Sequence, residues 1–154
     1  MNTIIEDTRQ KATKHENKHR SFAADNVTVI RCALPYGDYA PPPKVAVDTK
    51  QDVSEIAYNM CGPTKEKIRF RKECTTAQNA NCKLFFLIED NHYSLIDDLY
   101  GQTIYLHNKQ FISGDQLATA MHIMSDRYGC EFLFCKPDEA GWKIIELLEK
   151  YNGE

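Results

Sequence analysis

The chain has 154 residues, of which 42% are hydrophobic and 27% charged, and its formal net charge at pH 7 is −3. This length fits one domain with one sizeable core, and the composition excludes a chain that is disordered throughout. The charge excludes a bulk polycation, so nucleic acid would have to be bound through a local basic patch or through metal ions.

The cysteines and the apolar segments indicate a reducing, cytoplasmic location. We expect no signal peptide and no membrane span, because no apolar run has the required length. No two cysteines are spaced as Cys-x-x-Cys, so a zinc ribbon is not indicated. We expect free and mostly buried thiols, and a disulfide scaffold is the less favoured alternative. The six cysteines are Cys32, Cys61, Cys74, Cys82, Cys130 and Cys135.

The first third of the chain predicts strands around one polar helix. Strands are expected over residues 3–7, 27–32 and 44–50, with a further one beginning near Tyr39. Residues 10–24 are rich in charge and lack Gly and Pro, which predicts a mostly solvated helix. In the strand over 44–50, alternation places Asp48 and Lys50 on one face with Ala46.

The rest of the chain predicts helices that alternate with apolar strands. Asp52 is expected to cap one helix, Pro63 to open the next, and Gly114-Asp115 to cap a later one that Gly129 stops. In chain order, we expect helices over 52–60 and 63–80, a fully buried strand over 83–89, a loop-rich segment over 92–112, a helix over 114–127, a strand over 130–135 and a last helix from 137.

These elements predict an α/β sandwich with a mixed central sheet. Apolar residues at helical spacing in the last two helices are expected in the core, and an exposed apolar face there would support homodimerisation. The residues are Leu117, Met121, Met124, Trp142, Ile145, Leu147 and Leu148.

The pattern with the clearest chemistry is Gly37-Asp38, nine residues, then Asp48-Thr49-Lys50. Two neighbouring carboxylates can hold Mg²⁺, and the metal can lower the pKa of a bound water and neutralise charge on a phosphate. An ammonium on the same strand face can orient that water or stabilise the transition state. The pattern alone is weak, because acids near a lysine are usually solvated strand ends.

Five segments, in this order, make the chain resemble the nuclease domain of the XPF-type structure-specific endonucleases, a branch of the PD-(D/E)XK superfamily. They are Ile4-Ile5-Glu6-Asp7-Thr8-Arg9, Leu34-Pro35-Tyr36-Gly37-Asp38-Tyr39, Val47-Asp48-Thr49-Lys50, Arg69-Phe70-Arg71-Lys72-Glu73-Cys74 and the strand over 83–89. The resemblance implies a restriction-endonuclease-like three-layer sandwich, with a central mixed sheet flanked by helices. It would be a single nuclease domain over residues 1–154 without the family's helix-hairpin-helix module, like stand-alone forms in phages and mobile elements.

The resemblance also implies an activity and a site. Family members cut branched or junction DNA with Mg²⁺ or Mn²⁺, and the related family forms homodimers. Metal ligation would fall to Asp38 and Asp48 and catalysis to Lys50, with Asp7 near the metals and Arg9 toward a phosphate.

Two departures from the family pattern leave a second hypothesis open. Gln10 stands where an acid commonly follows, and Thr49 stands where the family has arginine. A protein that kept the fold and binds DNA with weak or no catalysis is therefore the alternative.

The densest basic cluster follows the predicted site. Its members are Lys65, Lys67, Arg69, Arg71 and Lys72. They would contact DNA phosphates, Arg69 foremost because of its place in the family motif, or form a solvated helix face. Glu73 could reach the metals or pair with Arg69 at i,i+4.

A remote alternative is a zinc metallopeptidase, because His15-Glu16-Asn17-Lys18-His19 matches the His-Glu-x-x-His pattern. The segment is polar all round and lacks an obvious third ligand. We therefore favour a solvated helix with two surface histidines.

Overall fold

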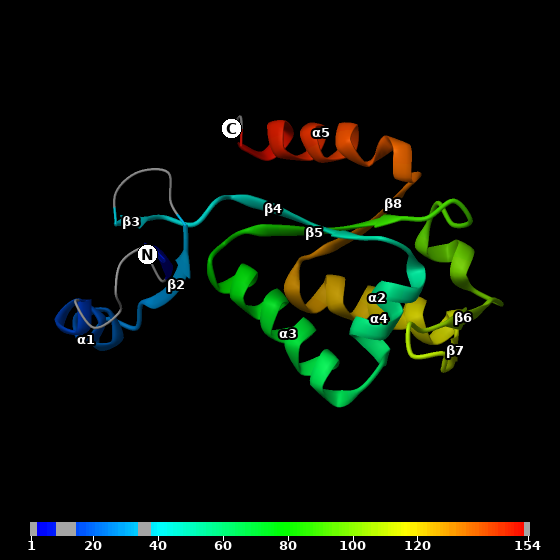
Figure 1. The fold of residues 1–154 in the computed structure, drawn as a ribbon, viewed down its shortest axis with the longest axis horizontal. Helices are drawn as coiled ribbons and strands as arrows, with labels where there is room; N and C mark the ends of the chain where they lie inside the picture. Colours follow the sequence, from blue (N-terminus) through cyan, green and yellow to red (C-terminus); the bar gives the residue numbers. More distant parts are fainter. Residues whose placement is uncertain (1–2, 9–14, 34–37, 153–154) are drawn as a thin grey trace. The chain divides into compact units, whose positions relative to one another are not determined.

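The computed structural model describes residues 3–8, 15–33 and 38–152. The chain divides into two compact units, Met1–Pro43 (unit 1) and Lys44–Glu154 (unit 2), and each is described by itself. Strands and helices alternate along the chain, which confirms the predicted α/β class (Figure 1).

Unit 1 contains a small mixed sheet with β1 (Thr3–Asp7) in its centre. β2 (Thr28–Cys32) pairs with β1 in parallel, and β3 (Tyr39–Ala40) pairs with it antiparallel. A parallel pair needs a crossover connection, and α1 (Glu16–Ala24) lies in it. The helix predicted over residues 10–24 is confirmed for these residues, and its part over residues 10–14 lies outside the described ones.

Unit 2 is built on a three-stranded parallel sheet. Its order is β4 (Val45–Lys50), β5 (Lys83–Glu89) and β8 (Glu131–Cys135), with β5 in the middle. Residues 84–88 of β5 are all buried, as predicted for a strand covered on both faces. The strands expected in one mixed sheet therefore lie in two sheets, and the mixed pairing belongs to unit 1.

Helices cover both faces of the unit 2 sheet, so this unit has three layers (Figure 1). α2 (Val53–Cys61), α3 (Thr64–Asn79) and α4 (Gly114–Tyr128) pack on one face, around Phe86. α5 (Ala140–Asn152) packs on the other, where Leu147 meets Val45 and Phe85. The alternation of β4 therefore points Val45 toward α5 and Ala46 toward α2 and α3.

Local hydrogen bonds explain where α2 begins. The Asp52 carboxylate accepts a hydrogen bond from the Glu55 backbone N–H at 2.8 Å, which confirms the predicted cap. The Asp90 carboxylate accepts another from the Val53 N–H at 3.0 Å. Carboxylates are favoured here because the first N–H groups of a helix have no partner within it.

The start of α4 differs from the prediction by one residue. The cap is Ser113, whose hydroxyl oxygen accepts from the Gln116 N–H at 3.1 Å. Gly114 instead packs against the backbone of Leu99, where an added Cβ would lie 1.7 Å from the carbonyl oxygen, so a larger residue does not fit. At the other end, Gly129 stops the helix as predicted, with a left-handed φ of 71°.

The segment predicted to be loop-rich contains short regular elements. These are the 3₁₀ turn η2 (Ile96–Leu99) and a hairpin of β6 (Thr103–Tyr105) and β7 (Phe111–Ser113). Strands of three residues are too short for an alternating pattern to stand out, which explains why the sequence did not reveal them. A further turn, η3 (Pro137–Glu139), precedes α5.

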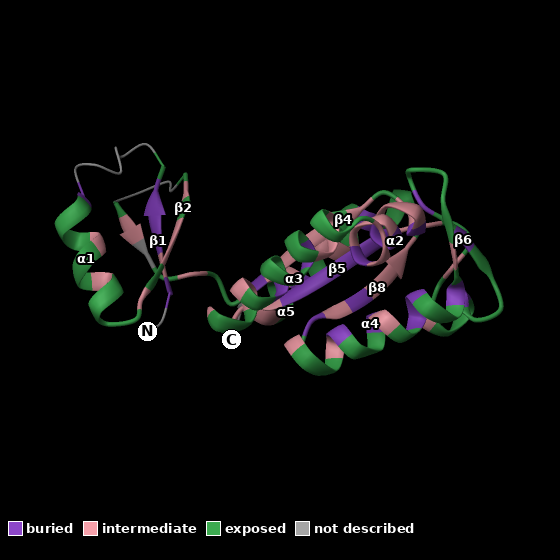
Figure 2. Cartoon of the chain, turned by 90° about the horizontal axis from the view of Figure 1, so that it is seen from below, coloured by how far each residue is buried: buried purple, intermediate pink, exposed green. Residues whose placement is uncertain are grey.

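The core prediction is confirmed in α4 and wrong for part of α5. Leu117, Met121 and Met124 are buried, whereas Trp142 and Ile145 are 78% and 49% exposed (Figure 2). The reason is that α5 is apolar on two sides. One side packs on the sheet through Leu147, Leu148 and Tyr151, and the other side carries Trp142 and Ile145.

All six cysteines are free thiols, as predicted, and Cys74 and Cys130 are buried. Among the described residues, no helix combines the length and apolarity needed to cross a membrane.

Phe86 is the residue whose truncation should cost unit 2 the most. It is fully buried, and its ring stacks on Phe70 at 4.7 Å and on Phe132 at 5.1 Å between centroids. We expect Phe86→Ala to lower the free energy of unfolding by about 3–5 kcal/mol, because it leaves a cavity. Urea unfolding followed by circular dichroism measures this. Ile68→Ala is the exposed apolar control, since Ile68 is 61% exposed on α3, and it should change stability by about 0.5 kcal/mol or less.

Candidate active site

Asp48 and Lys50 lie at the end of β4, on the sheet face that α2 and α3 cover. The Lys50 Nζ is 3.4 Å from the Asp48 Oδ2, and the two side chains are 12% and 25% exposed. The ammonium also lies 6.0 Å from the centre of the Phe86 ring. A charged pair so far removed from water interacts more strongly than one on the surface. The structure thus brings these two predicted residues together, and their roles remain predictions.

Glu73 joins this pair from α3. Its carboxyl group hydrogen-bonds Asp48, so it does not pair with Arg69, which contacts Glu66 at 3.4 Å. Partial burial raises the pKa of Glu73 to about 8, and the hydrogen bond and charge of Asp48 act in the same direction, while Lys50 opposes them. Two carboxyl groups that share one place cannot both ionise easily. Because the pKa of Glu73 lies near 8, its carboxyl group keeps its proton near neutral pH.

A pocket of about 230 Å³ opens beside these groups. Its lining is Lys50, Asn59, Glu66, Arg69, Phe70 and Glu73. Sequence reasoning missed Asn59 and Glu66. Asn59 was detectable as a polar residue beside the apolar Ile56 and Met60 of α2, both of which are buried.

Asn59 is notable for an oxygen atom that the protein does not satisfy. Its amide nitrogen donates to the Glu66 carboxylate at 3.4 Å. Its Oδ1 is buried and, within the described part of the chain, accepts no hydrogen bond. A buried acceptor without a partner is costly unless a ligand, ion or water supplies one. Asn59 lines the same pocket as Glu73, so this unsatisfied acceptor belongs to the wall of the pocket.

The predicted acids of unit 1 lie in a separate setting. Asp7 is buried at the end of β1, and its backbone N–H donates to the Asp38 carbonyl at 2.9 Å. Asp38 is exposed. Arg9 and Gln10 fall outside the described residues. The predicted convergence of Asp7 and Asp38 with Asp48 would join two units, and it stays a prediction.

Acid and histidine side chains do not gather in large groups in the described ranges. Among residues 3–8, 15–33 and 38–152, no three or more His, Cys, Asp or Glu side chains are placed to hold a metal together. The oxygen ligands that the candidate site could offer a cation are the carboxyl groups of Asp48 and Glu73, and Glu66 and Asn59 also line the pocket.

The His-Glu-x-x-His segment takes part in a buried polar network, so the expectation of two surface histidines was wrong. His15 is only 6% exposed and hydrogen-bonds the Tyr39 hydroxyl. His19 Nε2 lies 2.5 Å from Oε2 of the fully buried Glu6, whose Oε1 accepts from Arg31 Nε at 2.9 Å. Both histidines already have partners within the protein, and the zinc peptidase alternative loses its support.

Electrostatics explain why Glu6 can be buried. Burial acts to raise the pKa of this carboxyl group, but the hydrogen bonds and charges of His19 and Arg31 outweigh burial and lower it. The same desolvation, with the charge of Glu6, raises the pKa of Tyr39. Removing one member of such a network leaves a buried charge uncompensated, which is strongly destabilising. The network is therefore a structural element of unit 1.

The basic cluster of α3 lies on two sides of the helix. Lys67 and Arg71 face α4. Arg69 lines the pocket beside Glu73, and Lys65 and Lys72 are exposed four and three residues from it, so these three are neighbours on the helix surface. The contact of the five cations with DNA stays a prediction.

Comparison with known proteins adds little to this geometry. No protein-family profile and no curated protein sequence matches the chain. The solved structures that are similar to it include the XPF of Aeropyrum pernix, with 17% sequence identity and a TM-score of 0.47 over 96% of this chain and 63% of that chain. They also include this XPF in a complex with DNA, with 17% sequence identity and a TM-score of 0.44 over 97% of this chain and 64% of that chain. The chain spans less than two thirds of the length of either. A likeness of this degree assigns neither family nor function.

Glu73 should make the stability of the metal-free protein depend on pH. Its pKa in the folded protein, about 8, lies above the ordinary value of 4.5. The stability that it contributes is thus fully present below pH 4.5 and is lost as the pH rises through 8. Glutamine cannot ionise, so Glu73→Gln should gain stability relative to wild type between pH 5 and 9. We expect a gain of about 1 kcal/mol or less, since solvent screens this partly exposed group.

Urea unfolding of both proteins in EDTA, at several pH values, measures this difference. If the difference in the free energy of unfolding stays constant from pH 5 to pH 9, the pKa of Glu73 is not raised in the folded protein.

Proposed function

We propose that the site at the end of β4 hydrolyses phosphodiester bonds of DNA, and that the protein is a metal-dependent endonuclease. The observation that carries this proposal is the cluster of Asp48, Glu73 and Lys50. Glu73 and Lys50 line a pocket together with Arg69, and Asp48 lies behind them in contact with both. A phosphodiester is a stable anion, and its hydrolysis requires both an activated water and neutralisation of the charge that develops.

The oxygen donors of this site fit a divalent cation such as Mg²⁺ or Mn²⁺. Asp48 and Glu73 supply carboxylates, and Asn59 supplies the buried amide oxygen that has no protein partner. Mg²⁺ is usually held by one or two carboxylates and keeps several waters, so a larger set of protein ligands is not required. When bound, the cation would lower the pKa of a water and neutralise charge on the phosphate.

The remaining residues act on the substrate. Lys50 holds a positive charge beside Asp48 and can stabilise the developing negative charge on a phosphate oxygen. Arg69 is 65% exposed, and its 3.4 Å contact with Glu66 is a weak surface pair. Its guanidinium is therefore available to bind a phosphate at the pocket edge.

The finer parts of the proposal rest on the five segments that resemble XPF-type nucleases. They favour a branched or junction DNA substrate and a restriction-endonuclease-like sandwich in which unit 1 supplies Asp7, Arg9 and Asp38. A reducing cytoplasm is consistent with six free thiols.

A catalytically weak or inactive DNA-binding protein is the second candidate. Two observations favour it. Thr49 is exposed at the position where the family motif has arginine, and the described acids form no cluster of three. DNA binding without cleavage would identify this case.

Asp48→Asn tests the proposed chemistry, because it removes one carboxylate charge without changing the size of the side chain. We expect the rate of DNA cleavage with Mg²⁺ or Mn²⁺ to fall by roughly 100-fold or more. Loss of a residue that only hydrogen-bonds a metal ligand already lowers metal affinity or activity by about 10- to 100-fold, and loss of the ligand itself should cost at least as much. The assay follows labelled fork, flap, junction, duplex and single-stranded DNA on denaturing gels. Titration calorimetry should show that Mn²⁺ binding is lost in the same variant.

Asp126→Asn, an exposed aspartate of α4, is the matched control and should cleave like wild type. Equal cleavage by wild type and Asp48→Asn would exclude the proposed site.

We also propose a homodimer that uses the outward side of α5, because Trp142 and Ile145 expose a large apolar surface there. Sedimentation equilibrium should show a dimer for wild type and a monomer for Trp142→Glu. A monomeric wild type at high protein concentration would exclude it.

A further inference from the structure

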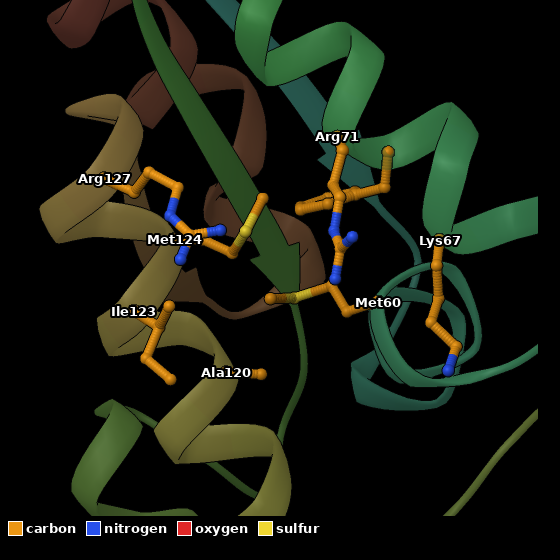
Figure 3. A pocket seen from close by; sticks show the side chains of 8 residues that line it. Met60, Lys67, Arg71, Ala120, Ile123, Met124 and Arg127 are labelled. Atoms are coloured by element: carbon orange, nitrogen blue, oxygen red, sulfur yellow. The ribbon is translucent and has the colours of Figure 1, made fainter. Parts of the chain in front are cut away.

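A second pocket, of about 160 Å³, lies on the side of α3 that faces α4. Its lining is Met60, Lys67, Phe70, Arg71, Ala120, Ile123, Met124 and Arg127. Figure 3 shows Arg71 on α3 and Arg127 on α4 extending toward the methionine side chains Met60 and Met124. The pocket is thus apolar inside and cationic at its edge.

The cations at this pocket are not neutralised by the described part of the chain. No acid belongs to the lining, and Lys67, Arg71 and Arg127 form no ion pair with an acid among the described residues. Lys67 and Arg71 are also four residues apart on one helix, where like charges repel and destabilise. An anionic ligand would relieve this repulsion. Without one, the three cations have no acid to pair with in the described part of the chain.

The apolar part of the pocket limits what the anion can be. Met60, Phe70 and Met124 are buried, and Ile123 is 48% exposed at the opening. A bare phosphate would leave this apolar surface unused, and a purely apolar ligand would leave the cations without partners. A nucleotide has both parts, since its phosphate suits the guanidinium groups and its base has flat faces that pack on methionine, isoleucine or arginine.

The position of the pocket links it to the candidate active site. Phe70, which is buried beneath α3, belongs to the lining of both pockets, so the pockets open on the two flanks of this helix. Arg69 and Arg71 are two residues apart and point to different sides of α3, so a DNA strand that contacts both passes over the exposed face of the helix. Base-paired nucleotides have their bases stacked inside the duplex, so only an unpaired base can enter a pocket.

We propose that this pocket binds one unpaired nucleotide of the DNA substrate, with its base against the methionines and its phosphate against Arg71 and Arg127. This inference rests on the proposed function, because it takes DNA as the ligand. It adds a reason for preferring branched DNA, since forks and flaps supply unpaired bases beside the scissile duplex.

The test compares two double variants that remove the same charge from different places. Arg71→Gln with Arg127→Gln changes the pocket, and Lys109→Gln with Lys136→Gln removes two exposed cations of unit 2 that lie outside α3 and outside both pockets. Fluorescence anisotropy with labelled single-stranded DNA measures the affinity. We expect the pocket variant to bind about 10-fold or more weakly, the order of one lost base contact, and the control to lose much less. Equal losses would overturn the proposal, because they indicate only general charge attraction.

A second measurement asks whether the base itself is bound. A strand of the same length with abasic sites keeps every phosphate but offers no base. Wild type should bind it about 10-fold more weakly than the intact strand, and the pocket variant should bind both equally weakly. If wild type binds the two strands alike, phosphate contact alone explains the cations and the proposal is wrong.

Failure of the proposed function gives a different result. If wild type cleaves no DNA but still prefers strands with bases, the nuclease activity is excluded and the nucleotide pocket stands. If wild type binds no single-stranded DNA, the pocket proposal fails whatever the cleavage result.

Discussion

The burial of β5 on both faces is the constraint on which the rest of unit 2 depends. Its two neighbours pair with it in parallel along fixed registers, in which Asp48 lies opposite Phe86 and Lys50 opposite Ile88. A shift of one residue would move every side chain of β4 to the other face of the sheet. The apolar strand therefore determines on which face the charged residues of its neighbour lie, although it carries no chemistry itself.

Both units keep charged groups away from water by pairing them closely. In unit 2, Asp48 has Lys50 on one side and the carboxyl group of Glu73 on another. In unit 1, Glu6 has His19 and Arg31. The two clusters differ in one respect that matters for function. The Glu6 network is satisfied within the protein, whereas the Asp48 cluster has an excess of oxygen donors and opens to a pocket. Unused bonding capacity in an accessible place is what a ligand-binding site requires.

The sequence predicted the elements well where a local signal was strong. The Asp52 cap, the Gly129 stop and the apolar run of β5 each depend on neighbouring residues alone. It also predicted that Asp48 and Lys50 share a face, because strand alternation is a local rule. The hairpin of β6 and β7 was missed, since its strands are too short to show a pattern.

Features that depend on tertiary packing could not be predicted in the same way. The contact of Glu73 with Asp48 joins residues 25 positions apart, and the sequence allowed an equally good partner one turn away in Arg69. The histidines of α1 looked solvated because their partners, Glu6 and Tyr39, come from other strands. Trp142 looked like a core residue because α5 is apolar on two sides, and only the position of the sheet decides which side is covered.

The stacking of Phe70 on Phe86 has a consequence for how this protein can change its length. The stack fixes the rotation of α3 about its own axis. The direction of each side chain after Phe70 therefore depends on how many residues separate it from Phe70. One inserted or deleted residue just after Phe70 would turn the rest of the helix by about 100° and carry Glu73 away from Asp48. Insertion of seven residues, close to two full turns, would nearly restore its direction but displace it along the axis by about 10 Å. We therefore expect natural variants of this chain to differ in length in the turns around α3 and not within the five-residue stretch from Phe70 to Cys74.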